Sequence, residues 1–526
     1  MKFVAIGLAA LSAAFAGTFA TAQSWNLAGD GSWNTAANWN PNTVPNAVGA
    51  AVTFNGAATG QTANRTITLD GQQTIGSVVF NNDVNSNNSI TTGTGTAPAL
   101  TFDNGGAGAT ITTQGSGTGN NTFTASFRMN DNVTAFVNNT TASSAAGSLN
   151  ITGVITGTGG FTKDGVGLAT FGTNSKTYTG PTVINNGRMR ISNAAQPSAT
   201  SSFTVNNGGQ VDFISSATYS LGTGTLTLNG AGPTSGPHAA FPGAIRPDTN
   251  LAIVVTNAVN LQTTATVHMQ GAATGSLTFN GAISGSGGFV AGAAVHDANI
   301  GQIVFNTSTN SYTGGTTVNA GTLVAGLAST NAFGTGNVSV LSANSVFAGS
   351  SARISLVAGE TNAIDDGATL SLAGGSVAAV ADDGYANIGA GVNETVGGLI
   401  LGGVAQTTPG TYGATGSGAN FIFDEYFSGT GLITLAPANV GVAGDYNNNG
   451  VVDAADYVLW RNGGPLQNEV DNPGILDAND YAAWRARFGN TSGAGTGLGA
   501  AGIPEPGTLS LIFLVISAGY AMRRGR

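Results

Sequence analysis

A thirteen-residue stretch near the end of the chain, GDYNNNGVVDAAD, concentrates oxygen-bearing side chains in a protein with few charges. Charged residues make up only 8% of the 526 residues, yet six of these thirteen are Asp or Asn. Oxygen donors fall at positions 1, 3, 5, 7, 9 and 12 of a loop that has Gly450 at position 6: Asp445, Asn447, Asn449, the Val451 carbonyl, Asp453 and Asp456. A Ca²⁺ ion requires this spacing, and the glycine turns the loop around it. The stretch predicts a calcium loop; a polar, asparagine-rich turn is the alternative.

The pattern recurs 24 residues later, where Asp480, Tyr481 and Trp484 repeat Asp456, Tyr457 and Trp460. Because Tyr and Trp three residues apart lie on one helical face, each loop is expected to lead into a helix. Counting back from Asp480 gives the second set of donors: Glu469, Asp471, the Ile475 carbonyl, Asp477 and Asp480. Position 5 is Pro473 and position 1 is the longer Glu, so we expect the second loop to bind calcium more weakly.

Residues 440–490 therefore resemble a type I dockerin, a duplicated calcium-loop and helix module that docks onto cohesin domains. The resemblance implies a small α-helical module, Ca²⁺ as its cofactor and a cohesin-like protein as its partner. It carries the ligand roles over to Asp445, Asn447, Asn449, Asp453 and Asp456. A module this small, without cysteine, is expected to depend on bound metal for its fold.

The bulk of the chain has a composition typical of strands and tight turns. Lys, Glu and Arg are scarce, whereas Thr, Asn, Val and 82 glycines are abundant. The net charge is −10, and only eight Lys or Arg lie between residues 24 and 440, so nucleic acid is not an expected partner. The absence of cysteine excludes disulfides and thiolate metal sites.

The long middle of the chain aligns with itself. The segment that begins at Ser148 matches the one that begins at Ser276, with Phe161 against Phe289. Runs such as TVINNGRMRIS place apolar residues at every second position on both sides of a glycine turn. One such rung cannot bury its apolar face alone, but a stack can. We therefore expect a mainly β solenoid with about 22 residues in each coil and a length on the order of 80 to 90 Å.

The segments TYTGPTVINNGRMRI and SYTGGTTVNAGTLVA resemble the autotransporter-associated β-strand repeat, which implies a right-handed parallel β-helix. We assign this β-helix to residues 146–437, and a tryptophan-rich cap with the first coils to residues 23–145. Trp25, Trp33 and Trp39 are expected to cover the first rung, since open strand edges recruit other chains. Stacking on sugar rings is the alternative for these aromatic residues.

Two acidic pairs are the visible candidates for glycoside hydrolysis, which needs two carboxyls facing each other at roughly 5 to 10 Å. The pairs are Asp365-Asp366 and Asp382-Asp383. Sequence neighbours point to opposite faces of a strand, and a following glycine favours a turn. The three histidines, His238, His268 and His296, lack ligand spacing, and the basic residues of the repeat are expected to be solvated on its outer face: Lys163, Lys176, Arg188 and Arg190. We predict that the chain is not an enzyme.

Both ends of the chain carry export signals. Residues 1–22 read as a cleaved signal peptide, with Lys2, an apolar run and a small-residue cleavage pattern. Residues 503–526 follow a glycine-rich linker (491–502) and contain Pro504-Glu505-Pro506, an apolar run and a basic tail. This order resembles the PEP-CTERM sorting signal of Gram-negative and planctomycete-like bacteria. It implies a C-terminal hydrophobic helix, transient membrane anchoring and cleavage by an exosortase-type processing enzyme.

These patterns predict a secreted β-solenoid scaffold or adhesin, at the cell surface or in the extracellular matrix, that displays a calcium-dependent docking module. The alternative is a polysaccharide-binding or polysaccharide-degrading component of an extracellular complex, with a polysaccharide as partner. A carboxylate cluster on one lateral face would favour the alternative. A face of Thr, Asn and Gly would favour the scaffold.

Overall fold

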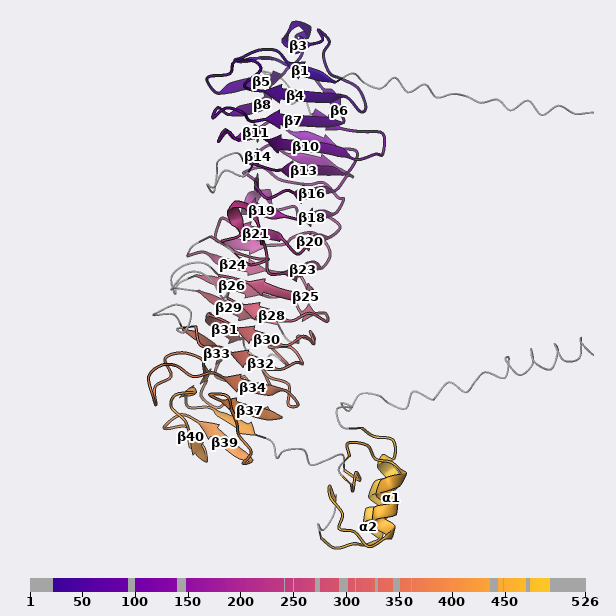
Figure 1. The fold of residues 1–526 in the computed structure, drawn as a ribbon, viewed down its shortest axis with the longest axis vertical. Helices are drawn as coiled ribbons and strands as arrows, with labels where there is room; N and C mark the ends of the chain where they lie inside the picture. Colours follow the sequence, from indigo (N-terminus) through magenta and orange to yellow (C-terminus); the bar gives the residue numbers. More distant parts are fainter. Residues whose placement is uncertain are drawn as a thin grey trace, which may run out of the picture. The chain divides into compact units, whose positions relative to one another are not determined.

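The structure, a computed structural model, divides the chain into two compact units, Met1–Ala436 and Pro437–Arg526 (Figure 1). It describes residues 22–92, 100–139, 148–240, 242–248, 250–269, 275–292, 301–307, 309–326, 330–343, 351–360, 362–435, 443–447, 449–469 and 474–491. The predicted sorting signal and its hydrophobic helix, and all but one residue of the predicted signal peptide, lie outside these ranges. Among the helices that the structure describes, none combines the length and hydropathy needed to span a bilayer.

The first unit is a stack of parallel coils, as the alternating pattern predicts. Its longest series of paired parallel strands comprises β4 (Ala51–Asn55), β7 (Ser77–Asn81), β10 (Ala109–Gln114), β13 (Val133–Val137), β16 (Phe161–Asp164), β18 (Thr182–Ile184), β20 (Phe203–Val205), β23 (Leu226–Gly230), β25 (Val259–Val267), β28 (Phe289–Ala291), β30 (Thr316–Val318), β32 (Val338–Val340), β34 (Thr369–Leu372) and β37 (Gly398–Leu401). The short strand β27 (Ile283–Ser284) also pairs with β25.

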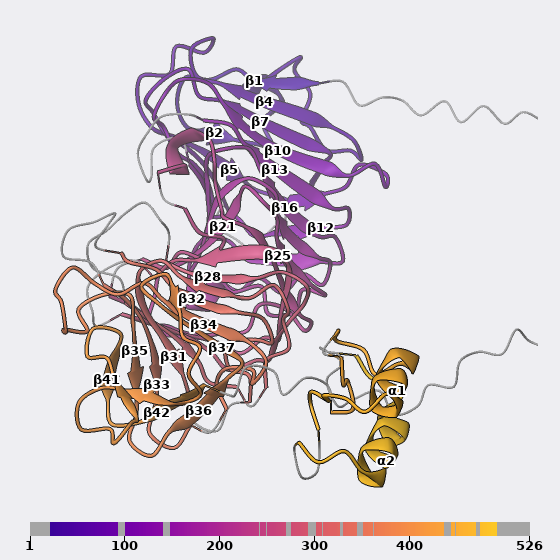
Figure 2. The same cartoon turned by 60° about the horizontal axis from the view of Figure 1, so that its bottom comes forward.

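Further parallel sheets form the other faces of the stack (Figures 1 and 2). One contains β2 (Gly31–Ser32), β5 (Arg65–Leu69), β8 (Asn88–Thr92), β11 (Asn121–Phe123), β14 (Leu149–Ile151), β17 (Leu168–Phe171), β19 (Gly187–Ile191) and β21 (Gly209–Phe213). The next contains β22 (Ala217–Tyr219), β24 (Ala252–Val255), β26 (Ser276–Phe279), β29 (Gln302–Phe305), β31 (Gly321–Ala325), β33 (Ala352–Leu356), β35 (Tyr385–Ile388) and β41 (Phe427–Gly429). A shorter one contains β6 (Gln73–Ile75), β9 (Leu100–Phe102), β12 (Phe127–Met129) and β15 (Ile155–Gly157).

The register gives the coil length directly. Phe161 pairs with Thr182 and Thr182 with Phe203, so the coils of the first repeat advance by 21 residues, close to the expected 22. Val78 pairs with Ile111, so this coil is longer, at 33 residues. The parallel solenoid is therefore established, and the right-handed sense of its coil remains a prediction.

Alternate residues of each strand point into one continuous apolar core. In β5, Ile67 and Leu69 are buried while Thr66 and Thr68 face outward, and the same alternation recurs from coil to coil. Phenyl rings stack between coils, as Phe54 does on Phe80 at 5.3 Å between ring centroids. This interior stacking stabilises a long body without disulfides.

Antiparallel strands and aromatic residues occur at both ends of the stack. At the N-terminal end, β1 (Gln23–Trp25) pairs in parallel with β4 and antiparallel with β3 (Trp39–Asn40), which follows a short 3-10 helix, η1 (Ala36–Asn38). Trp39 packs against Trp25 and Trp33 at 5.1 and 4.7 Å between ring centroids. All three tryptophans are at most 1% exposed, so no indole face is available to a sugar ring. They pack over Phe54 of the first coil.

At the C-terminal end, antiparallel pairing joins β37 to β38 (Val404–Ala405) and β39 (Gly410–Gly413) to β42 (Leu432–Leu435). Two further short strands complete this region: β36 (Asn393–Val396) and β40 (Phe421–Ile422). Two 3-10 turns, η2 (Asn193–Ala195) and η3 (Gly236–His238), interrupt the middle coils. The second unit contains α1 (Ala454–Arg461) and α2 (Ala478–Arg487).

Candidate functional site

The first predicted calcium loop folds around the carboxylate of Asp445, which is fully buried. This carboxylate accepts hydrogen bonds from the backbone N–H groups of Asn449 (3.1 Å) and Gly450 (2.7 Å). The side-chain oxygen of Asn447 accepts from Asn449, and that of Asn449 accepts from Val451. Gly450 has φ +89°, a left-handed conformation that glycine adopts without strain. Positions 1, 3, 5 and 6 thus form one tight turn.

The last position of the same loop, Asp456, is also fully buried and closes the turn from the other side. It accepts from the N–H of Asn447 at 3.0 Å and from the N–H of Asp453 at 2.8 Å. Asp453 in turn caps α1 by accepting from the N–H of Ala455 at 2.7 Å. The first and twelfth positions therefore both bond to the backbone of this loop.

Two of these contacts recur 24 residues later in the second loop, and α1 and α2 each follow a loop, as the sequence predicts. Glu469 accepts from the N–H of Gly474 at 2.6 Å, and Asp480 accepts from the N–H of Asp477 at 2.8 Å. Asp480 is 1% exposed, and its Oδ1 has no hydrogen-bond partner among the described residues.

Two other residues of the second predicted donor set give no evidence on whether this loop binds a metal. Asp471 lies outside the described residues. Ile475, whose carbonyl was predicted as a donor, has a side chain that is 60% exposed. The ligand assignment of this loop stays a prediction.

Reciprocal hydrogen bonds join the two halves of the module. The indole N–H of Trp460 on α1 donates to the carbonyl of Asp477 at 2.9 Å, and that of Trp484 on α2 donates to the carbonyl of Asp453 at 2.8 Å. Tyr457 lies 5.1 Å from Trp484 between ring centroids, so the aromatic pairs of the two helices pack together. Each helix therefore positions the position-9 residue of the opposite loop.

The donor chemistry of the first loop fits Ca²⁺. The described residues contain no group of three or more His, Cys, Asp or Glu that could hold a metal ion, so amide and carbonyl oxygens would have to complete the set. Ca²⁺ accepts such mixed oxygen ligands. Asp445 and Asp456 are both buried, and their hydrogen-bond donors are neutral backbone groups. Buried negative charge of this kind calls for a cation.

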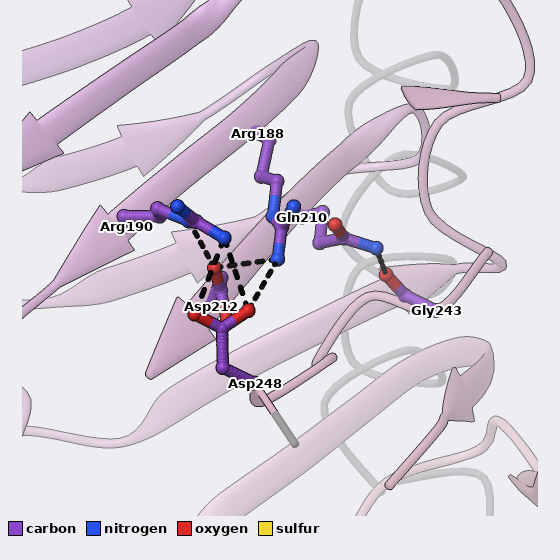
Figure 3. Close-up of polar contacts among 6 residues, drawn as sticks. All are labelled: Arg188, Arg190, Gln210, Asp212, Gly243 and Asp248. Carbon is purple, nitrogen blue, oxygen red and sulfur yellow. Dashed lines mark hydrogen bonds and ion pairs between the residues drawn. The ribbon is translucent and has the colours of Figure 1, made fainter. Parts of the chain in front are cut away.

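A second cluster of charged side chains, on the solenoid, was missed by sequence reasoning. Arg188, expected to be solvated, is 4% exposed and lies 2.6 Å from the fully buried carboxylate of Asp212 (Figure 3). Arg190 contacts the same carboxylate at 2.7 Å, and both arginines reach Asp248, at 3.2 and 3.0 Å. The cluster ties β19 to β21 and to the segment of the following coil that carries Asp248.

The arginines do point outward from their strand, but another part of the chain covers them. Gln210, beside Arg188 in the register, donates to the carbonyl of Gly243 at 2.8 Å (Figure 3). A Cβ on Gly236 would approach the Cβ of Val166 to 2.5 Å, so η3 packs closely on this face. The covering segment comes from a later coil, and no local pattern in the sequence of the strand predicts it.

The two repeat lysines, also expected to be solvated, are fully buried. Lys163 donates to the carbonyls of Asp164, Gly165 and Asn186 at 2.9, 2.6 and 2.8 Å. Lys176 donates to the carbonyl of Gly153 at 2.8 Å. The expectation was wrong because an ammonium group can satisfy several turn carbonyls at once inside a coil corner. The lysines cross-link successive turns.

Burial controls protonation in the charged cluster. It raises the pKa of Asp212 to about 6, against the opposing effect of the two arginines. Burial and the nearby positive charge of Arg188 lower the pKa of His238, in η3, to about 4. At neutral pH the cluster therefore combines two cations, two carboxylates and a neutral imidazole. It is an ion-pair network with its charges compensated.

The acidic pairs lie in turns between strands, as their sequence predicts. Asp383 is buried and accepts from the N–H groups of Ala343 (3.1 Å), Ala352 (2.7 Å) and Gly384 (2.9 Å) and from the hydroxyl of Ser342 (2.8 Å). This carboxylate fastens two neighbouring coils. Its role in the fold explains its presence without catalysis.

Comparison with known proteins bears on the solenoid alone. A family model described as Passenger-associated-transport-repeat matches residues 161–191 and 301–325, one segment in each of the two aligned copies. No curated protein and no solved structure matches the chain. The match agrees with the resemblance to autotransporter-associated repeats and suggests a secreted or surface protein. Within residues 161–191 and 301–325, the chain is similar to this transport-associated repeat.

Proposed function

We propose that this protein is a secreted scaffold or adhesin whose solenoid displays a calcium-dependent protein-docking module at the cell surface or in the extracellular matrix. The single observation that carries the docking half is the pair of buried carboxylates, Asp445 and Asp456, in a loop whose other predicted donors, apart from Asp453, are neutral oxygens. The scaffold half rests on the stack of parallel coils and on the passenger-type repeat match.

The outward positions of the solenoid support a scaffold. Thr66, Thr68, Ser89 and Thr122 lie side by side on one sheet as partly exposed, uncharged residues. Such a surface supplies stiffness and solubility without reactive groups. Two buried carboxylates of the solenoid, Asp212 and Asp383, are held by guanidinium and backbone N–H groups, respectively.

The surface of the module supports a protein partner. Four of its large apolar side chains are strongly exposed: Val458 (53%), Ile475 (60%), Leu476 (43%) and Phe488 (57%). Exposed apolar groups on a small domain are typical of an interaction surface. A cohesin-like protein is the partner that we propose, with an exosortase-type enzyme processing the C-terminal segment after export and transient membrane anchoring.

A calcium-switched capture experiment tests the docking half. The purified chain is immobilised and exposed to envelope extract of the producing cell, first with calcium and then with a chelator. We expect a defined set of proteins to be retained in calcium and released by the chelator, because loop geometry sets the exposed helix surface. Titration calorimetry of the same protein should show one stronger and one weaker calcium site.

The matched variants are Asp445→Asn with Asp456→Asn in the first loop and Asp365→Asn in a turn of the solenoid. The loop variant should lose both the stronger calcium site and the calcium-dependent capture, while the solenoid variant should keep both. Retention of the same proteins with and without calcium would show that docking does not depend on the metal.

A further inference from the structure

A polar groove lies on the part of the sheet formed by β29, β31, β33, β35 and β41. Its volume is about 470 Å³, within the range of small-ligand sites. The parallel register aligns its outward side chains in columns. Thr322 pairs with Arg353 and Arg353 with Tyr385 in one column. The groove is thus built from five successive strands, whose spacing the backbone ladder fixes.

Among the described residues, Arg353 is the one charged residue that lines the groove, and its guanidinium is held in place. Its Nε donates to the hydroxyl of Thr322 at 2.9 Å, and its Nη1 donates to the hydroxyl of Tyr385 at 2.9 Å. These contacts leave Nη2 as a donor. No carboxylate of the described residues lies within ion-pair distance of Arg353. A positioned, unpaired guanidinium favours an anionic group such as a carboxylate or sulfate.

The neighbouring column offers hydroxyl and amide groups. Asn387 donates to the hydroxyl of Ser355 at 3.2 Å and accepts from the hydroxyl of Ser428 at 3.0 Å. All three side chains are partly exposed, so their remaining donors and acceptors face the groove. A row of alternating donors and acceptors is suited to a ligand with several hydroxyl groups.

We propose that this groove binds an acidic saccharide, with a carboxylate or sulfate of the sugar on Arg353 and its hydroxyls on Ser355, Asn387 and Ser428. The proposal gives the solenoid a ligand of its own and does not depend on calcium or on the docking module. A scaffold with such a groove would adhere to an anionic glycan along its side.

Titration calorimetry of the full chain with three trisaccharides tests the proposal. The probes are trigalacturonate, a sulfated trisaccharide and the uncharged galactotriose. We expect trigalacturonate or the sulfated probe to bind about tenfold more tightly than galactotriose, because one charge-assisted hydrogen-bonded pair contributes about that gain in affinity. Comparison of the two acidic probes identifies the acid that the groove prefers.

Three variants localise the binding. Arg353→Gln should remove the preference for the acidic sugar, and Asn387→Asp, which places a carboxylate in the groove, should weaken acidic but not neutral binding. Arg128→Gln removes an exposed arginine of β12, on another sheet, and should change nothing. Thermal melting confirms that each variant is folded.

Three outcomes would overturn the proposal. The first is that neither acidic probe binds the unaltered chain. The second is that folded Arg353→Gln binds them as the unaltered chain does. The third is that Arg128→Gln loses as much affinity as Arg353→Gln, which would indicate nonspecific charge attraction.

Discussion

Single charged residues do more in this protein than its composition suggests. Lys163, Lys176 and Arg188 belong to a chain with only 8% charged residues, and each is almost completely buried. Burial of a charge is costly unless hydrogen bonds or an opposite charge compensate it. Here the compensating groups come from neighbouring coils. Each buried charge therefore fixes the register between turns that apolar packing alone would allow to shift.

The buried ion pair gives a first prediction. Arg188→Leu should lower the free energy of unfolding of the solenoid by about 3 kcal/mol, because Asp212 then keeps a buried charge with one partner fewer. The double variant Arg188→Leu, Asp212→Leu should recover much of that loss. Urea unfolding followed by circular dichroism measures both.

The comparison needs an arginine that makes no such pair. Arg128→Leu changes an exposed residue and should shift the free energy by no more than about 0.5 kcal/mol. If the double variant were less stable than Arg188→Leu alone, the pair would not be the source of the effect.

Glu394 gives a prediction about pH. Burial, reinforced by the charges of Glu360 and Asp366, raises the pKa of Glu394 to about 7, against the N–H groups of Ala363 and Ile364. The folded chain therefore binds a proton more readily than the unfolded chain between the ordinary pKa of 4.5 and about 7. Stability contributed by this proton is present at the acidic side of that window and is lost as pH rises through it.

The urea midpoint of the solenoid should thus be higher near pH 5 than near pH 8, with Asp212 adding to the trend. Glu394→Gln should reduce this difference, whereas Asp83→Asn at an exposed turn should preserve it. An unchanged pH difference in Glu394→Gln would assign the trend to other groups.

At the scale of elements, the sequence predicts the strands better than it predicts the segments that cover their outward faces. Alternating apolar residues and glycine turns give the coils of the repeat because burial on one face repeats every second residue. The loop spacing predicts a turn in which Asn447 and Asn449 lie beside Asp445, whereas the full set of calcium ligands stays a prediction. The burial of Arg188 could not be predicted in the same way, because η3 and Asp248 reach it from a later coil. Lys163 escaped prediction because its partners are backbone carbonyls, which carry no sequence signal.

The tryptophan cap gives an element-scale prediction. Trp39→Ala removes a fully buried indole that packs on two others, and should cost about 3 to 5 kcal/mol. It should also expose the edge of β4, so that light scattering detects larger particles as the protein is concentrated.

A matched aromatic deletion separates capping from general apolar loss. Phe488→Ala removes a residue that is 57% exposed on the second unit and should leave the solenoid monodisperse. Equal association of the two variants would mean that the indole cluster does not protect the strand edge.

At the scale of the whole molecule, two units with separate interiors should unfold separately. Calcium binding to the folded second unit would stabilise it by mass action, by about 2.7 kcal/mol when calcium exceeds the dissociation constant a hundredfold. A chelator should therefore lower the melting temperature reported by Trp460 and Trp484 fluorescence. The strand signal in circular dichroism should not move.

The loop variant Asp445→Asn, Asp456→Asn provides the control. Its fluorescence transition should already lie at the lower temperature, and the chelator should not shift it further. A chelator that shifted both transitions equally would show that the units do not melt independently. A chelator that shifted neither transition would show that metal binding does not contribute to the stability of the second unit.

The closing strands described at either end of the solenoid have a consequence for assembly. Head-to-tail growth of such bodies into filaments needs a parallel strand edge free at each end, and here β3, β38 and β39 run antiparallel to β1, β37 and β42, respectively. At these strands, copies that meet end on lack a parallel ladder to share. Association of copies through the flanks of the solenoid would instead respond to mutations of the outward threonines.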